Sequence, residues 1–201
     1  MINLTIYGDS ISTDTHGEGG YAKRLLKSGI FYEIKSFAIS GSGLSSSTPN
    51  NLYSIIIEKS IIPHNSDWII IWHGTNDWFY GSKIDLFESQ FFEIIDRLKN
   101  ALPKTQILCL LPIYRYETPE GCPYPGNAFI TKNKIGLTLS DYRASLLKII
   151  QLRELAYIDM TASTKLFQED ISRYYEDQVH PNKFGMDIIS EIIASFFKSI
   201  I

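Results

Sequence analysis

The chain has 201 residues, which is long enough to bury one sizeable core, and we expect a single domain over residues 1–201. With 44% apolar and 20% charged residues it has the composition of a soluble globular protein, which excludes a disordered or collagen-like chain. The net charge is −3 and the lysines and arginines are scattered, so we expect no nucleic-acid partner.

Neither the cysteines nor the apolar segments indicate secretion or membrane insertion. Cys109 lies in an apolar run and Cys122 in a loop rich in proline and glycine, a distribution that does not indicate a disulfide framework. The first residues carry no basic region or cleavage site of a signal peptide. No segment approaches the run of about 18 apolar residues that a membrane span needs. We therefore expect a cytoplasmic protein without a membrane span, and its oligomeric state stays open.

Strand-like and helix-like segments alternate along the chain. The expected strands are Leu4 to Tyr7, Tyr32 to Ile39, Trp68 to Trp72, Gln106 to Leu111 and Ala156 to Asp159. The expected helices are Tyr21 to Ser28, Leu52 to Ile62, Leu86 to Leu102, Leu139 to Leu152 and Lys183 to Phe197. The third strand is an unbroken apolar run, which suits a strand buried on both faces of a parallel sheet. The alternation predicts an α/β fold, a three-layer α/β/α sandwich with a parallel sheet of about five strands.

Polar segments follow the strands of this expected sheet. They are Gly8-Asp9-Ser10, Gly41 with its neighbours, Gly74-Thr75-Asn76-Asp77 and, just before the last helix, Asp177 to His180. The long irregular stretch from Pro112 to Thr138 follows the fourth strand, and connections of that length are usually functional. Ligands of open parallel sheets bind beyond the carboxyl ends of the strands, so these segments predict a site at that edge.

Ser10, His180 and Asp177 are the residue types of a serine-hydrolase triad. A serine hydroxyl is a poor nucleophile at neutral pH, so it needs a base to take its proton and a third group to orient the base. Asp177 lies three residues before His180, so one loop could present both, with the carboxylate accepting a hydrogen bond from the imidazole. Ser10 could instead only cap a helix, and His180 could be a simple loop histidine. The combination favours catalysis.

Other histidines compete with this interpretation. His16, His64 and His73 are the rivals of His180, and His16, His73, His180 and Asp77 could in principle gather a metal ion. No short ligand spacing such as His-Glu-x-x-His is present, so we expect no metal and no other cofactor. The segment Gly17-Glu18-Gly19-Gly20 lacks the ending of a phosphate-binding loop, and we interpret it as a turn before the first helix.

The four polar segments, from residue 8 to residue 180, resemble in order and spacing the four blocks of the SGNH (GDSL-type) hydrolases. The first block reads Gly-Asp-Ser-Ile-Ser instead of ending in leucine, a change that touches no catalytic group. The resemblance implies the flavodoxin-like SGNH hydrolase fold, with Ser10 as nucleophile, His180 as base and Asp177 as the residue that orients it. It also implies an oxyanion hole formed by the amides of Ser10 and Gly41 and the side chain of Asn76.

Simple chemistry supports such an oxyanion hole. Attack by Ser10 on an ester would place negative charge on oxygen, and each donor aimed at that oxygen is worth about 3 to 4 kcal/mol. Gly41 has no Cβ and allows a close approach of the backbone, and Asn76 offers an amide NH2 group. Gly43 is the rival of Gly41, but Ala-Ile-Ser-Gly is more similar to the second block of the family.

Aromatic residues follow the third and fourth strands. They are Trp78, Phe79, Tyr80, Tyr114, Tyr116, Tyr124 and Phe129. These rings could line a substrate pocket or only pack the loops that carry them, and the two roles do not exclude each other. As substrate-binding candidates we take Trp78, Tyr114 and Tyr116.

Together these features predict a serine esterase that forms an acyl-enzyme on Ser10 and acts on a small-molecule ester without a cofactor. A short-acyl or acetyl ester of a carbohydrate or similar small molecule is favoured over a lysophospholipase or thioesterase substrate, because no long apolar lid is evident. The alternative from another class is a non-catalytic protein of the same fold that binds a small molecule or carbohydrate. The presence of all the catalytic residue types argues against it.

Overall fold

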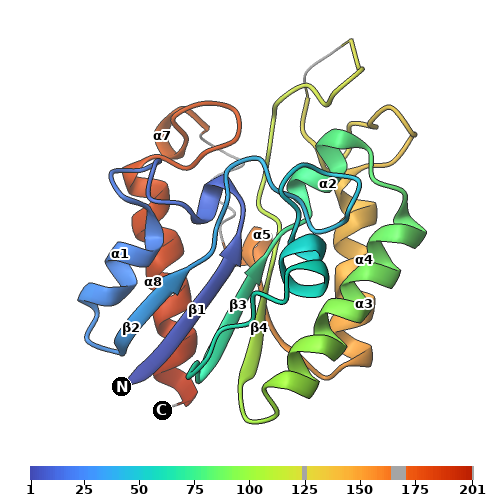
Figure 1. The fold of residues 1–201 in the computed structure, drawn as a ribbon. Coiled ribbons are helices and arrows are strands. Elements are labelled where there is room, and N and C mark those ends of the chain that lie inside the picture. Colours follow the sequence, from blue (N-terminus) through green and yellow to red (C-terminus); the bar gives the residue numbers. More distant parts are fainter. Residues whose placement is uncertain (124–125, 164–170, 201) are drawn as a thin grey trace.

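The computed structural model describes residues 1–123, 126–163 and 171–200. Five strands form one sheet in the order β2-β1-β3-β4-β5 (Figure 1). They are β1 (Ile2–Gly8), β2 (Phe31–Ser36), β3 (Trp68–Trp72), β4 (Gln106–Leu111) and β5 (Ala156–Asp159). All four neighbouring pairs are parallel, which confirms the expected sheet, and the strand order is that of flavodoxin-like folds.

Helices cover both faces of the sheet (Figure 1). On one face α1 (Gly20–Lys27) packs beside α8 (Lys183–Ile200), and on the other α3 (Ile84–Ala101) packs beside α4 (Leu139–Leu152). The shorter elements are η1 (Ser10–Ser12), η2 (Ser54–Glu58), α2 (Thr75–Tyr80), α5 (Met160–Ser163) and α7 (Ile171–Tyr174). The three-layer α/β/α sandwich is therefore confirmed. Among the described residues, no helix combines the length and apolarity that crossing a membrane requires.

Alternate residues of the central strand supply two apolar cores. In β3, Ile70 and Trp72 join the core beneath α1 and α8, whereas Ile69 and Ile71 join the core beneath α3 and α4. All four are at most 3% exposed. A strand buried on both faces needs apolar side chains at every position, which explains the unbroken run in the sequence. β3 lies between β1 and β4 and is the centre of the sheet, as expected.

One expected helix is shorter than predicted. Of residues 52–62, only 52–58 are helical, and Ser54–Glu58 form the π-helical segment η2, in which the N–H of Lys59 donates to the carbonyl of Ser54 at 2.9 Å. Three consecutive isoleucines lie in this segment, and their β-branched side chains lower helix propensity. Ser60, with a φ of 51°, then turns the chain away. In addition, β2 ends at Ser36 rather than Ile39, whereas β3, β4, β5 and α4 have the expected bounds.

Candidate active site

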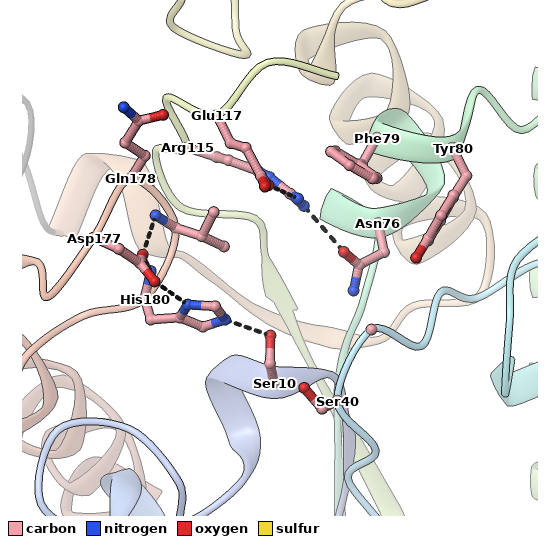
Figure 2. Close-up of a pocket in the computed structure, with 12 residues that line it drawn as sticks. Ser10, Ser40, Asn76, Phe79, Tyr80, Arg115, Glu117, Asp177, Gln178 and His180 are labelled. Carbon is pink, nitrogen blue, oxygen red and sulfur yellow. Dashed lines mark hydrogen bonds and ion pairs between the residues drawn. The ribbon is translucent and has the colours of Figure 1, made fainter. Parts of the chain in front are cut away.

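A cavity of about 670 Å³ opens at the carboxyl ends of the strands (Figure 2). It is lined by Ser10, Ser40, Gly41, Asn76, Phe79, Tyr80, Arg115, Glu117, Asp177, Gln178, Val179 and His180. These residues follow β1, β2, β3 and β4 in turn, and the last four precede α8. The fold thus gathers the polar segments at one edge of the sheet. The volume is within the range of about 300 to 1,000 Å³ that is usual for small-molecule sites.

Ser10 lies at the exit from β1, where the chain turns into η1. The carboxylate of Asp9 caps this short helix by accepting the N–H of Ile11 at 3.0 Å. Asp9 is 2% exposed, and burial raises its pKa to about 7. The cap and the rigid strand before it hold Ser10 at the floor of the cavity.

Ser10, His180 and Asp177 form a continuous hydrogen-bonded chain (Figure 2). Nε2 of His180 lies 2.8 Å from Oγ of Ser10, and Nδ1 lies 2.8 Å from Oδ2 of Asp177. Because Nδ1 faces a carboxylate, it carries the proton of the neutral ring, and Nε2 is left as the acceptor for the serine hydroxyl. The structure therefore brings together the three residues that the sequence suggested as a triad.

The segment that carries Asp177 and His180 is a closed turn before α8. Tyr175 and Pro181 form an isolated antiparallel bridge, and the N–H of Glu176 donates to the carbonyl of His180 at 2.9 Å. The side chain of Asn182 then accepts the first free amides of α8. The three-residue spacing of aspartate and histidine thus corresponds to a tight turn.

The carboxylate of Asp177 is held in its charged form. Burial acts to raise its pKa, but hydrogen bonds from the His180 side chain and from the amides of His180 and Val179 outweigh it and hold the pKa below the usual value. The two amide contacts, at 2.6 and 2.7 Å, both reach Oδ1. Asp177 is therefore ionised at neutral pH, and its charge favours a positive imidazole ring.

Gly41 lies in the cavity wall with a φ of 75°, in the left-handed region that favours glycine. A Cβ at this position would meet nothing within 4 Å, so the backbone conformation, not a lack of space, calls for glycine. In the rival residue Gly43, the N–H already donates to Oγ1 of Thr48 at 3.1 Å. Of the two amides, that of Gly41 is therefore the one available to a ligand.

Asn76 lies in the first turn of α2, and both the nitrogen and the oxygen of its side-chain amide are hydrogen-bonded. Nδ2 donates to the carbonyl of Ser42 at 2.8 Å, and Oδ1 accepts from Nη1 of Arg115 at 3.0 Å. A guanidinium can only donate, so the atom that faces it must be the oxygen. The NH2 group therefore lies on the side of Ser10, and one of its two hydrogens stays free for a ligand (Figure 2).

Arg115 is the main cavity residue that the sequence analysis missed. It follows β4 and is 5% exposed; its guanidinium lies 4.6 Å from the ring centroid of Phe79 and is paired with Glu117. It also donates to the carbonyl of Thr75 at 3.3 Å. No periodicity or motif distinguishes this arginine within the long stretch after β4, so no sequence signal could have identified it.

The prediction that Trp78 lines the site is wrong. Trp78 is fully buried, and its indole N–H donates to the carbonyl of Thr131 at 3.2 Å. Phe79 and Tyr80 line the cavity instead. They lie three and four residues after Asn76, which places all three on one face of a helix, while Trp78 points into the core. This helical spacing could have identified them once Asn76 was known.

Tyr114 and Tyr116 do not line the cavity either. Tyr114 packs against Phe129, with ring centroids 5.0 Å apart, and Tyr116 donates its backbone N–H to Gln178 at 2.8 Å. Arg115, which lies between them in the sequence, lines the cavity instead. These aromatic residues pack the loop, which was the alternative left open. Tyr124 lies outside the described residues.

The rival histidines occupy different settings. His73 is 3% exposed, does not line the cavity, and has its pKa lowered to about 4 by burial, so it is neutral at pH 7. His64 is exposed in the segment before β3, and His16 lies against His180. In the part of the chain that the structure describes, no three histidine, cysteine or acidic side chains are grouped to hold a metal ion.

Comparison with solved structures identifies the same fold in several proteins. A protein from Lactobacillus plantarum is 20% identical, with a TM-score of 0.75, over 98% of this chain and 97% of that one. Axe2, an acetylxylan esterase from Geobacillus stearothermophilus, is 17% identical with a TM-score of 0.68, over 98% and 94%. The salicylyl-acyltransferase SsfX3 from a tetracycline biosynthetic pathway is 17% identical with a TM-score of 0.73, over 96% and 52%. At such identities the likeness shows the fold alone.

Sequence comparison is more specific about the family. No curated protein sequence matches the chain. The model of the GDSL-like lipase/acylhydrolase family matches residues 6–188, a range that contains all four polar segments. Since this match covers most of the chain and the sheet has the order expected for the fold, the chain belongs to the GDSL-like lipase/acylhydrolase family.

Proposed function

We propose that the protein is a serine ester hydrolase that forms an acyl-enzyme on Ser10. The observation that carries this proposal is the hydrogen-bonded chain from Asp177 through His180 to Ser10, with both contacts of His180 at 2.8 Å, at the floor of the cavity. Membership of an acylhydrolase family supports the same class of reaction.

The hydrogen-bonded residues Asp177, His180 and Ser10 act in both steps of the proposed reaction, acylation and deacylation. As Oγ of Ser10 attacks the ester carbon, its proton passes to Nε2 of His180, and Asp177 stabilises the charged ring. His180 then returns the proton to the leaving alcohol, which leaves an acyl group on Ser10. A water molecule that gives its proton to His180 attacks this acyl group, and the acid departs as Ser10 regains its proton.

Three donors are available for the negative oxygen that forms in each step. The amides of Ser10 and Gly41 donate to no other described residue, and Asn76 keeps one free hydrogen. Donors fixed before the reaction stabilise the developing charge without rearrangement, which is the main advantage of an oxyanion hole. Arg115 contributes indirectly because it fixes the orientation of the Asn76 amide.

The cavity wall favours a polar alcohol with a short acyl group. Glu117 and Gln178 lie on the side away from Ser10 and offer hydrogen bonds to hydroxyl groups, while Phe79 and Tyr80 offer aromatic faces (Figure 2). A long acyl chain, as in lysophospholipids, needs an extended apolar surface, and the described wall instead mixes charged groups with these rings. We infer a short-acyl or acetyl ester of a carbohydrate or similar small molecule. The likeness to the acetylxylan esterase Axe2 is consistent with this class.

The proposal is tested with a fluorophosphonate probe and a series of esters. The probe should label Ser10, and nitrophenyl esters from acetyl to long-chain should show a sharp fall in kcat/KM beyond short chains. Acetylated sugars should be hydrolysed. A protein that neither reacts with the probe nor hydrolyses any ester would be a binding protein, whereas activity that rises with chain length would favour a lysophospholipase or thioesterase.

Replacing Asn76 with alanine should lower kcat by about a hundredfold or more, with a smaller change in KM, because its donor matters most once charge develops. Steady-state kinetics with nitrophenyl acetate measures both constants. Asn100→Ala, at an exposed position of α3, is the matched control and should keep the wild-type values. A change confined to KM would instead mean that Asn76 binds the ground-state substrate.

Replacing Arg115 with methionine should lower kcat by about tenfold, the effect of losing one hydrogen bond to a charged group. The reason is that the Asn76 amide loses the partner that sets its orientation. In an Asn76→Ala background the same substitution should cause little further loss, since residues that act through one another are not additive. Equal losses in both backgrounds would show that Arg115 acts independently of Asn76.

A further inference from the structure

A second histidine lies on the ring of His180. The rings of His16 and His180 are parallel within 5°, with centroids 3.7 Å apart, which is van der Waals contact across the whole face. The side chain of His180 is 18% exposed and that of His16 is 24% exposed, so each ring shields the other from solvent. His180 is therefore held at Nδ1 by Asp177, at Nε2 by Ser10, and across one face by His16.

Glu176 holds His16 in this position. Its Oε2 lies 3.0 Å from Nδ1 of His16, its Oε1 accepts the N–H of Gly17 at 2.6 Å, and its own N–H donates to the carbonyl of His180 at 2.9 Å. Two acidic residues that are adjacent in the sequence thus each hold one of the two stacked rings. Because Nδ1 of His16 faces a carboxylate, it carries the proton of the neutral ring and donates to Glu176, which fixes the orientation of the ring.

The glycine-rich turn after His16 makes this arrangement possible. All four residues from Gly17 to Gly20 have positive φ values, between 57° and 98°. A Cβ on Gly17 would lie 2.4 Å from the side chain of Met186 in α8, so the turn can approach that helix only with glycine there. The segment interpreted from sequence as a plain turn thus brings His16 onto His180, in the turn before α8.

We propose that His16 is a positioning residue for the reaction, an inference that rests on the proposed function. When His180 takes the proton of Ser10 it becomes a cation, and the face of an aromatic ring attracts a cation. His16 presents that face, and the Glu176 carboxylate holds the ring at its edge through Nδ1. The stack also restricts rotation of the His180 ring, which keeps Nε2 directed at Ser10. The attraction needs the charge that develops on His180 during the reaction, so it acts on kcat more than on KM.

The test compares His16→Ala, which removes the ring, with His16→Phe, which keeps an aromatic face. The readouts are kcat and KM for nitrophenyl acetate and the rate at which a fluorophosphonate labels Ser10. We expect His16→Ala to lower kcat and the labelling rate by about three- to tenfold, the range for one cation–aromatic contact, and His16→Phe to recover most of the loss. Glu176→Ala, which releases His16 without removing it, should resemble His16→Ala.

His64→Ala is the matched control, since His64 is exposed before the amino end of β3 and does not line the cavity, which lies beyond the carboxyl ends of the strands. The inference is overturned if His16→Ala keeps the wild-type kcat and labelling rate, if only KM changes, or if His16→Phe is as slow as His16→Ala. Failure of the wild-type protein to react with the probe would overturn the proposed function itself. Reaction of the wild type and the alanine variant at equal rates would overturn only the role of His16.

Discussion

Replacing Ser10 with alanine is expected to abolish ester hydrolysis, with a fall in kcat of the order of a millionfold, as for other triad serines. The substitution removes the nucleophile and leaves His180 with no hydroxyl to activate. Oγ of Ser10 contacts His180 at the cavity floor, so its loss removes little packing, and the melting temperature should stay near that of the wild type. The measurements are kcat with nitrophenyl acetate, thermal unfolding and labelling by a fluorophosphonate.

A serine outside the cavity provides the control for this variant. Ser89 is exposed on α3 and donates to the carbonyl of Leu86, so Ser89→Ala should be as active as the wild type. Hydrolysis near the wild-type rate in Ser10→Ala would show that another group is the nucleophile.

Replacing Asp177 with asparagine should lower kcat by about ten-thousandfold, because the side chain keeps its shape but loses its charge. An amide NH2 facing Nδ1 of His180 would also favour the tautomer with its proton on Nε2, which cannot accept the proton of Ser10. The loss should be present at every pH. Rates measured from acidic to neutral pH for wild type and variant would show it.

The decrease of activity at acidic pH, the acid limb of the pH–rate profile, supplies a second readout. A general base must be neutral, so activity falls as His180 takes a proton in acid. Asp177 contacts the ring that takes this proton, so removing its charge should move this acid limb. The wild-type carboxylate itself stays ionised in this range because its pKa is lowered. Unchanged turnover with an unchanged limb would mean that Asp177 does not orient His180.

The charge of Asp177 should also affect stability. Folding lowers its pKa, so its contribution to stability is present above the unfolded value and is lost as the pH falls through the folded value. As the pH falls from the unfolded-state pKa to the folded-state pKa of Asp177, the free energy of unfolding of Asp177→Asn should therefore decrease less than that of the wild type. Chemical denaturation at several acidic pH values would measure this difference.

The sequence by itself determined the layers of the fold and the identity of the three triad candidates. Strands such as Trp68–Trp72 are buried on both faces, and this demands apolar residues at every position, a pattern that is visible without coordinates. A serine nucleophile likewise needs specific residue types after specific strands, so Ser10, Asp177 and His180 were recognisable by chemistry and order. Burial on both faces and nucleophilic chemistry both restrict which residue types can occupy a position, and residue types can be read directly from the sequence.

Only the tertiary structure decided where the other side chains point. Trp78 enters the core while Phe79 and Tyr80 line the cavity, because the start of α2 sets which face each residue occupies. Arg115 reaches Asn76 from an irregular stretch that has no periodicity to interpret. His16 and Glu176 lie 160 positions apart and meet beside His180 through a turn with positive φ values that packs on α8. Such contacts depend on loop conformation and on the packing between distant segments, neither of which a local sequence pattern encodes.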